Sequence, residues 1–202
     1  MNTCYIIGAG DVTLLPRFDE TDLVIAADGG YHALVRQGRR CDILIGDMDS
    51  IGQVPNEVER KVFPVRKDET DTYLAYLEGR ARGYCEFELY GATGGRSDHT
   101  FANYSLLLKM ANDGCHGSIL FDTGTALVIK NDTITLLGTE GEHLSVFAIG
   151  REAHGVSVSG AEYECEGITL TPDFPLGVSN SFRRTPVTIE VSDGAILIIT
   201  EE

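Results

Sequence analysis

The sequence contains no tryptophan, and its 202 residues include only three methionines and six prolines. Aromatic contact with a flat ligand must therefore come from its eight phenylalanines, eight tyrosines or five histidines. No apolar run approaches the roughly 20 residues of a membrane-spanning helix, and the first residues, MNTCYIIGAGD, contain no basic leader. We therefore expect a cytoplasmic protein that does not enter a membrane.

Positive charge is also scarce. Sixteen Lys and Arg residues stand against 31 Asp and Glu, which gives a formal net charge of -15. This balance argues against passive binding to nucleic acid or to an anionic membrane. Residues 1–125 hold 12 of the basic residues and 126–202 hold four. An anionic substrate would need local Lys or Arg side chains or a metal ion, and the first part of the chain supplies most of that positive charge.

The cysteines exclude two further classes of protein. They are odd in number, widely scattered and without a CxxC pair, so the sequence indicates neither a zinc site nor a disulfide framework. We interpret all five as reduced thiols: Cys4, Cys41, Cys85, Cys115 and Cys165.

Residues 1–125 alternate short apolar runs with stretches of helical period. The runs that predict strands are CYIIGAG, LVIAADGG, DILIGDMDS, VFPV, EFELYGATGG and SILFDT. The stretches YHALVRQG, TDTYLAYLEGRARG and HTFANYSLLLKMANDG predict helices that end at glycine. This alternation predicts an N-terminal α/β domain whose mainly parallel sheet is covered by helices on both faces.

The pattern changes at about residue 125. From 126 to 202 the chain contains short strands of alternating polarity, punctuated by Gly, Asn and Asp, with no helical period. We expect a small all-β domain of sandwich or barrel type. The sequence thus predicts two domains, 1–125 and 126–202, that join without a linker.

Polar residues follow four successive predicted strands of the first domain. In an open α/β sheet, ligands gather at the carboxyl ends of the strands. Carboxylates, glycines and two cationic residues would therefore meet at one edge of the sheet. They fall in the segments DGG (28–30), GDMDS (46–50), KDETD (67–71) and GATGGRSDH (91–99).

Each segment alone has a plainer explanation. An Asp-x-Asp pair in a loop is more often turn chemistry than a metal site, and Asp28 or Asp71 could simply cap a helix. Together the four segments favour a cation-binding site, because carboxylates gathered in a cleft repel one another unless a cation lies among them. Mg²⁺ suits such ligands and phosphate oxygens, while Lys67 and Arg96 can neutralise phosphate charge. The combination predicts a site of nucleotide phosphate transfer.

Five ordered segments resemble the motif series of the thiamine pyrophosphokinases. They are DGG at Asp28, GDMDSI at Gly46, KDETDTYLA at Lys67, GATGGRSDHTFAN at Gly91 and FPLGVSNSF at Phe174. The resemblance covers nearly the whole chain, including its change from α/β to β. It implies an α/β domain followed by a β-sandwich, and a kinase of thiamine diphosphate biosynthesis that converts ATP and thiamine into thiamine diphosphate and AMP.

The resemblance also implies roles for individual residues. Asp47, Asp49 and Asp71 match aspartates that bind Mg²⁺, and with Asp98 they form the predicted catalytic set. Ser179, Asn180 and Ser181 match a turn that contacts thiamine. The residues that match the ATP site are Asp28, Gly29, Gly30, Lys67, Asp68, Thr70, Arg96, Asp98, His99 and Asn103. A homodimer is implied, with each active site shared between the ATP domain of one subunit and the thiamine domain of the other.

Several points stay open at the level of sequence. Either Asp71 or Asp98 could accept the proton of the thiamine hydroxyl. Without tryptophan, Phe182 is the nearest aromatic candidate for stacking on thiamine, although a core position would be its ordinary role. Another Mg²⁺-dependent, nucleotide-using transferase is an alternative function. A non-catalytic module that holds Ca²⁺ is a third, but it leaves Lys67, Arg96 and the glycines unexplained.

Overall fold

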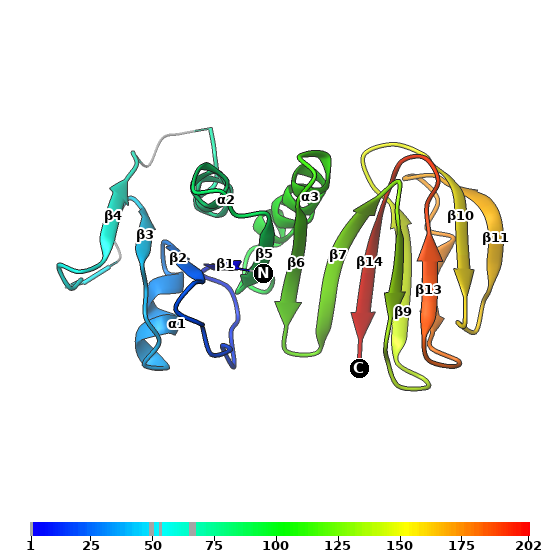
Figure 1. Cartoon of the computed structure of the whole chain (residues 1–202), viewed down its shortest axis with the longest axis horizontal. Coiled ribbons are helices and arrows are strands. Elements are labelled where there is room, and N and C mark those ends of the chain that lie inside the picture. Colours follow the sequence, from blue (N-terminus) through cyan, green and yellow to red (C-terminus); the bar gives the residue numbers. More distant parts are fainter. Residues whose placement is uncertain (1, 49–50, 53, 65–67) are drawn as a thin grey trace. The chain divides into compact units, whose positions relative to one another are not determined.

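The computed structural model describes residues 2–48, 51–52, 54–64 and 68–202. The chain divides into two compact units, one of Met1–Leu106 with Gly117–Asp122 and one of Leu107–His116 with Thr123–Glu202. The elements of each unit can be followed by colour, from blue to red, in Figure 1.

The first unit is built on parallel strands. The registers of β1–β2, β1–β5, β2–β3 and β3–β4 are all parallel, and the strand order is β6-β5-β1-β2-β3-β4. The order reverses at β1, because the chain adds β2, β3 and β4 on one side of β1 and β5 on the other. The elements are β1 (Thr3–Ile7), β2 (Leu23–Ala27), α1 (Gly30–Arg36), β3 (Ile43–Gly46), β4 (Glu59–Val62), α2 (Asp71–Ala81), β5 (Glu86–Tyr90), α3 (Ser97–Asn112) and β6 (His116–Phe121).

Helices α1 and α2 pack on opposite faces of these strands. Side chains alternate between the two faces of a strand, so Cys4 and its neighbour Tyr5 point to different sides. Gly79 of α2 lies against Cys4 and Phe87, where a Cβ atom would clash with both side chains. Leu34 of α1 instead belongs to the core cluster of Val24 and Leu44, which Tyr5 also contacts.

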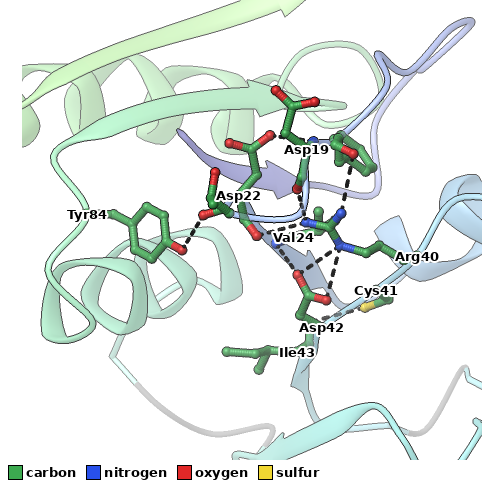
Figure 2. Close-up of polar contacts among 10 residues, drawn as sticks. Asp19, Asp22, Val24, Arg40, Cys41, Asp42, Ile43 and Tyr84 are labelled. Carbon is green, nitrogen blue, oxygen red and sulfur yellow. Dashed lines mark hydrogen bonds and ion pairs between the residues drawn. The ribbon is translucent and has the colours of Figure 1, made fainter. Parts of the chain in front are cut away.

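A polar cluster fixes the other end of β2 and β3, away from their carboxyl ends (Figure 2). Arg40 donates from Nη2 to the backbone carbonyls of Asp19 and Asp22, both at 2.8 Å, and pairs with the Asp42 carboxylate at 3.3 Å. Asp42 also accepts from the backbone N–H of Val24 at 2.8 Å. These charged groups hold the backbone in place, and none of the predicted site residues lies among them.

The second unit consists of antiparallel strands in two sheets that share one core. The orders are β12-β9-β14-β7 and β11-β10-β13-β8. Val146 and Ile196 from the first set of strands meet Val156 and Ile189 from the second in one buried cluster, so the unit is a β-sandwich. Its strands are β7 (Gly124–Lys130), β8 (Thr133–Leu136), β9 (His143–Ala148), β10 (Ala153–Ser159), β11 (Cys165–Leu170), β12 (Gly177–Ser181), β13 (Val187–Glu190) and β14 (Ala195–Glu201).

The predicted fold is confirmed in its coarser form. The strands of the chain are mixed in orientation, the parts of the chain that the structure describes contain three helices, and a separate antiparallel sheet is present. None of those helices is long and apolar enough to cross a membrane. All five cysteines are free thiols. The predicted division at residue 125 stays a prediction.

One predicted strand and one predicted turn need correction. The VFPV run does not form a strand of its own, since β4 occupies Glu59–Val62 and ends where that run begins. β4 is the last strand in its order and three of its four residues are exposed, so it carries no apolar signal. Ser179, Asn180 and Ser181 were expected in a turn but lie in β12 (Gly177–Ser181), which pairs with β9 across a register shift.

Candidate functional site

The carboxyl ends of β1 and β5 meet at the point where the strand order reverses. Ligands of open α/β sheets bind at such points. Gly8 donates from its backbone N–H to the Tyr90 carbonyl at 2.7 Å, and Gly10 donates to the Gly91 carbonyl at 2.8 Å. A Cβ on Gly10 would overlap the carbonyl oxygen of Thr93, so the two loops can approach only because glycine stands there.

The sequence analysis did not assign Gly8, Gly10 or Asp11 to the site. GAG alone is a weak motif, and its closeness to the GATGG loop depends on the pairing of β1 with β5, which are far apart in sequence. Asp11 donates from its backbone N–H to the Thr93 carbonyl at 3.2 Å, and its carboxylate lies against Gly94. These three residues therefore join the candidate site on geometry.

Two of the predicted aspartates follow adjacent strands. Ala27 of β2 pairs with Ile45 of β3, and the backbone N–H of Asp28 donates to the Ile45 carbonyl at 2.7 Å. Asp28 and Asp47 therefore leave the sheet side by side. Asp28 has φ of 46°, a left-handed conformation that few residues other than glycine adopt. A strained residue at a strand end is typical of functional sites.

The two glycines after Asp28 have a structural reason. Gly29 is the N-cap of α1, and a Cβ on Gly30 would overlap the carbonyl group of Ile7 in β1. Glycine is thus required for α1 to begin so close to the sheet. The structure brings Gly29 and Gly30 to the same edge as Asp28, as predicted, without testing contact with ATP.

The third predicted segment leads into α2. Thr70 is the N-cap of this helix, and its hydroxyl accepts from the backbone N–H of Tyr73 at 3.1 Å. Asp71 occupies the first helical position, so Thr70 is the capping residue and Asp71 is not. Asp68 is exposed just before the helix. Asp49 and Lys67, which were predicted for the metal and for ATP, lie outside the described residues.

Arg96 and Asp98 bind each other at the start of α3. Two parallel hydrogen bonds join the guanidinium to the carboxylate, at 2.6 Å and 3.1 Å, while both side chains stay exposed. The Arg96 hydrogen bond holds the pKa of Asp98 below its usual range, and the neighbouring backbone N–H of His99 adds to this effect. A carboxylate with a lowered pKa is a weaker proton acceptor.

Asn103 has a role in positioning the site. It is buried, and its Nδ2 donates to the backbone carbonyl of Ala92 at 2.7 Å. The bond ties α3 to the GATGG loop. A buried polar side chain with a satisfied hydrogen bond stabilises the loop conformation, so Asn103 supports the predicted ATP site from within the protein.

The predicted carboxylates are of the type that binds Mg²⁺, but those that the structure describes do not form a preformed metal-binding cluster. Among the residues that the structure describes, no three His, Cys, Asp or Glu side chains lie close enough together to hold a metal ion. Mg²⁺ is commonly bound by one or two carboxylates together with waters and substrate phosphates. Asp47 and Asp71, with Asp49 from outside the described residues, fit that mode as a donor set.

In the second unit, the predicted thiamine turn lies in β12. Asn180 is buried, and its carboxamide binds the backbone of Tyr163 twice: Oδ1 accepts from the Tyr163 N–H at 2.9 Å, and Nδ2 donates to the Tyr163 carbonyl at 2.8 Å. Ser179 is exposed with φ of 59°. Ser181 ends β12 and is partly exposed. The three residues are neighbours, but the Asn180 carboxamide is largely used by the fold.

The suggestion that Phe182 stacks on thiamine is wrong. Its side chain is 2% exposed and belongs to the sandwich core. In β-strands alternate residues face the core, and Phe182 follows the buried Asn180 by two positions.

A cavity of about 390 Å³ lies beside Asn180, wholly within the second unit. Its walls are mainly aliphatic side chains from β9, β10, β11 and β12. Three residues with polar side chains, Tyr163, Glu164 and Asn180, also line it. The full set is Val146, Val156, Val158, Tyr163, Glu164, Cys165, Ile168, Leu170, Leu176, Gly177, Val178 and Asn180.

Two family descriptions match successive parts of the chain. "Thiamin pyrophosphokinase, catalytic domain" matches residues 16–118, and "Thiamin pyrophosphokinase, vitamin B1 binding domain" matches residues 129–196. The chain belongs to the thiamin pyrophosphokinase family. The catalytic-domain match contains the ends of β2, β3 and β5 and the GATGG loop, whereas Gly8, Gly10 and Asp11 lie before it. The second match contains β12 and the cavity.

Relatives of this thiamin pyrophosphokinase family member extend over its full length. A thiamine pyrophosphokinase of Bacillus subtilis is 24% identical over 210 residues, which cover 98% of each chain. Thiamine pyrophosphokinase 1 of Oryza sativa is 24% identical over 92% of this chain and 83% of its own.

Solved structures share the fold. The crystal structure of the Bacillus subtilis thiamine pyrophosphokinase has a TM-score of 0.87 at 22% identity and covers 99% of both chains. The thiamin pyrophosphokinase of Candida albicans has a TM-score of 0.77 at 15% identity, over 100% of this chain and 89% of its own.

Proposed function

We propose that this chain is a thiamine diphosphokinase, which transfers the pyrophosphoryl group of ATP to the hydroxyl of thiamine and releases AMP. The observation that carries this function is the presence of both family parts, catalytic and vitamin B1 binding, in order on one chain. The activity makes the protein a transferase and a kinase of thiamine diphosphate biosynthesis. Curated relatives of nearly the same length bear the same name.

In the proposed reaction, the thiamine hydroxyl oxygen forms a bond to the β-phosphorus of ATP. The bond between that phosphorus and the oxygen bridging to the α-phosphorus breaks, and AMP leaves with the bridging oxygen. Such transfers depend mainly on alignment and charge neutralisation. The parallel strands and helices of the first unit would serve as the α/β domain that aligns ATP.

We assign ATP to the strand ends of the first unit. Asp47, Asp49 and Asp71 would hold Mg²⁺, which when bound neutralises phosphate charge and fixes phosphate geometry. Lys67 and Arg96 would neutralise the remaining charge, and either Asp71 or Asp98 would accept the hydroxyl proton. The closeness of the β1, β2, β3 and β5 ends supports this assignment. The other residues proposed to surround ATP are Asp28, Gly29, Gly30, Asp68, Thr70, Asp98, His99 and Asn103.

We assign thiamine to the β-sandwich, next to Ser179, Asn180 and Ser181. The cavity beside Asn180 supports this assignment.

We further propose a cytoplasmic homodimer that shares its active sites. Exposed apolar side chains in and before β12, namely Phe174, Leu176 and Val178, support a partner surface on this unit. Light scattering should give about twice the chain mass of 21.9 kDa for a dimer. A mass equal to that of one chain would contradict the homodimer proposal.

The function is tested by product analysis. Purified protein is incubated with ATP, Mg²⁺ and thiamine, and AMP and thiamine diphosphate are quantified, with EDTA and thiamine-free controls. Equal, Mg²⁺-dependent amounts of both products are expected. Another nucleotide-using transferase would form no AMP together with thiamine diphosphate, and a Ca²⁺-binding module would release no AMP at all.

A further inference from the structure

The cavity of the β-sandwich has the character of a small-molecule site. It holds about 390 Å³, a volume suited to a small ring system, and its walls are mostly aliphatic. Apolar walls favour a ligand with a flat, weakly hydrated surface. Its polar side chains are few: Tyr163 and Glu164 are neighbours in sequence, and Asn180 is hydrogen-bonded to the backbone of Tyr163.

Asn180 holds the segment that carries Tyr163 and Glu164. Its two hydrogen bonds to the Tyr163 backbone imitate a pair of strand residues and fix a segment just before β11. A third bond, from the Ser181 N–H to Oδ1 at 2.9 Å, fixes the carboxamide itself. Asn180 is therefore placed to position its neighbours. The Tyr163 side chain remains 70% exposed and free to cover a ligand.

Glu164 brings a negative charge to the cavity. Its Oε1 accepts from the backbone N–H of Gly160 at 2.7 Å, and the pKa of the carboxyl lies below its usual range, mainly because of that bond. The partner charge, Arg184, lies 3.4 Å away, and its side chain is 73% exposed. An exposed ion pair of this kind is weak, so Glu164 can give up Arg184 for a bound cation at little cost in free energy.

We propose that Glu164 is the counter-charge for the positively charged ring of the acceptor, that Tyr163 covers this ring, and that Asn180 positions both residues. This inference rests on the proposed function, in which the acceptor is a thiazolium cation. An aliphatic cavity with one carboxylate and one exposed phenol ring is suited to a flat heteroaromatic cation. The acidic second part of the chain, with 12 acidic and four basic residues from 126 to 202, also attracts a cation.

The test compares a charged with a neutral ligand on the full-length protein. Calorimetric titration with 3-benzyl-5-(2-hydroxyethyl)-4-methylthiazolium and with neutral 5-(2-hydroxyethyl)-4-methylthiazole gives the preference for the cation. Wild type should bind the cation about tenfold or more tightly than the neutral ring. Glu164→Gln keeps an oxygen that can accept from Gly160 but removes the charge, so this preference should fall about tenfold.

Glu166→Gln is the matched control. Glu166 is exposed in β11, is absent from the cavity lining and undergoes the same change of charge. It should keep the wild-type preference. Equal preferences in wild type and Glu164→Gln, or an equal loss in Glu166→Gln, would overturn the proposal.

Positioning by Asn180 has its own readout. Asn180→Ala should raise the KM for thiamine by about tenfold while the KM for ATP and kcat at saturating thiamine change little. A fall in kcat with unchanged KM would contradict a positioning role, and Glu164→Gln decides the charge claim if Asn180→Ala does not fold. If wild type makes no thiamine diphosphate, the proposed function fails, whereas the titrations still decide the cation site.

Discussion

At the scale of single residues, carboxylates in this chain divide into two kinds. Asp42 and Asp98 form ion pairs with Arg40 and Arg96, and the Arg96 hydrogen bond holds the pKa of Asp98 below its usual range. Asp47 directly follows a strand, at the position where a phosphate-transfer site needs carboxylates that can bind a cation. We assign the metal to Asp47, Asp49 and Asp71 because these three residues match the magnesium-binding aspartates in the motifs that the chain shares with its family.

Asp49→Asn should lower turnover by about 10²-fold or more, because one charge is lost from the proposed Mg²⁺ ligands. Circular dichroism should remain that of wild type. The steady-state rate of AMP formation measures the effect. Glu57→Gln, an exposed change of the same charge in the same unit, should be neutral. Near-wild-type turnover in Asp49→Asn would remove Asp49 from the metal site.

Glu88 gives a pH dependence with a definite sign. Its pKa is raised, chiefly by burial and also by the nearby Asp22. The folded state then holds the proton to higher pH than the unfolded chain, so stability falls as pH rises through the raised pKa. Glu88→Gln should therefore increase the urea midpoint more at pH 7 than at about pH 4. A gain that is equal at both pH values, or one shared by Glu86→Gln on the same strand, would contradict this account.

The sequence motifs predicted the positions of residues at strand and helix ends well. They predicted the hydrogen-bond partners of individual side chains less well. Asp28 and Thr70 fall at strand or helix ends as the motifs require. The buried amides Asn103 and Asn180 looked like ligand contacts, yet their polar atoms bind backbone groups. Sequence alone does not show this, because burial and the partner backbone arise only on folding.

At the scale of elements, long apolar periods were predictable and short edge elements were not. Helices α2 and α3 lie where their 3.6-residue patterns predicted them. β4 and β12 were misplaced, since each stands at the end of its strand order and neither shows a regular alternation of buried and exposed residues. An edge strand needs no apolar alternation, so its pattern resembles that of a loop.

The start of α2 gives a prediction for an element. Thr70→Ala removes the hydroxyl that accepts from the Tyr73 N–H and should cost about 1 kcal/mol of unfolding free energy. Thr70→Ser keeps the acceptor and should stay close to wild type. Urea unfolding followed by circular dichroism measures both variants. Equal loss in the two would mean that the methyl group, and not the cap, stabilises the helix.

At the scale of the whole molecule, the two units differ in their charged residues and in the kind of ligand that each could bind. The first unit carries most of the basic residues and the glycine loops suited to phosphates, and the second is acidic with an aliphatic cavity suited to a ring. The two family matches follow the same division along the chain. The change from helical to alternating patterns near residue 125 predicted two parts of different fold type, and the boundary between them stays a prediction.

The most direct test of this account follows the γ-phosphorus of ATP. The protein is incubated with γ-labelled ATP, Mg²⁺ and thiamine, and label is quantified in each product. Pyrophosphoryl transfer predicts one labelled phosphorus in every thiamine diphosphate and one unlabelled AMP for each. Label in thiamine monophosphate together with ADP, or AMP formation without thiamine diphosphate, would contradict the account.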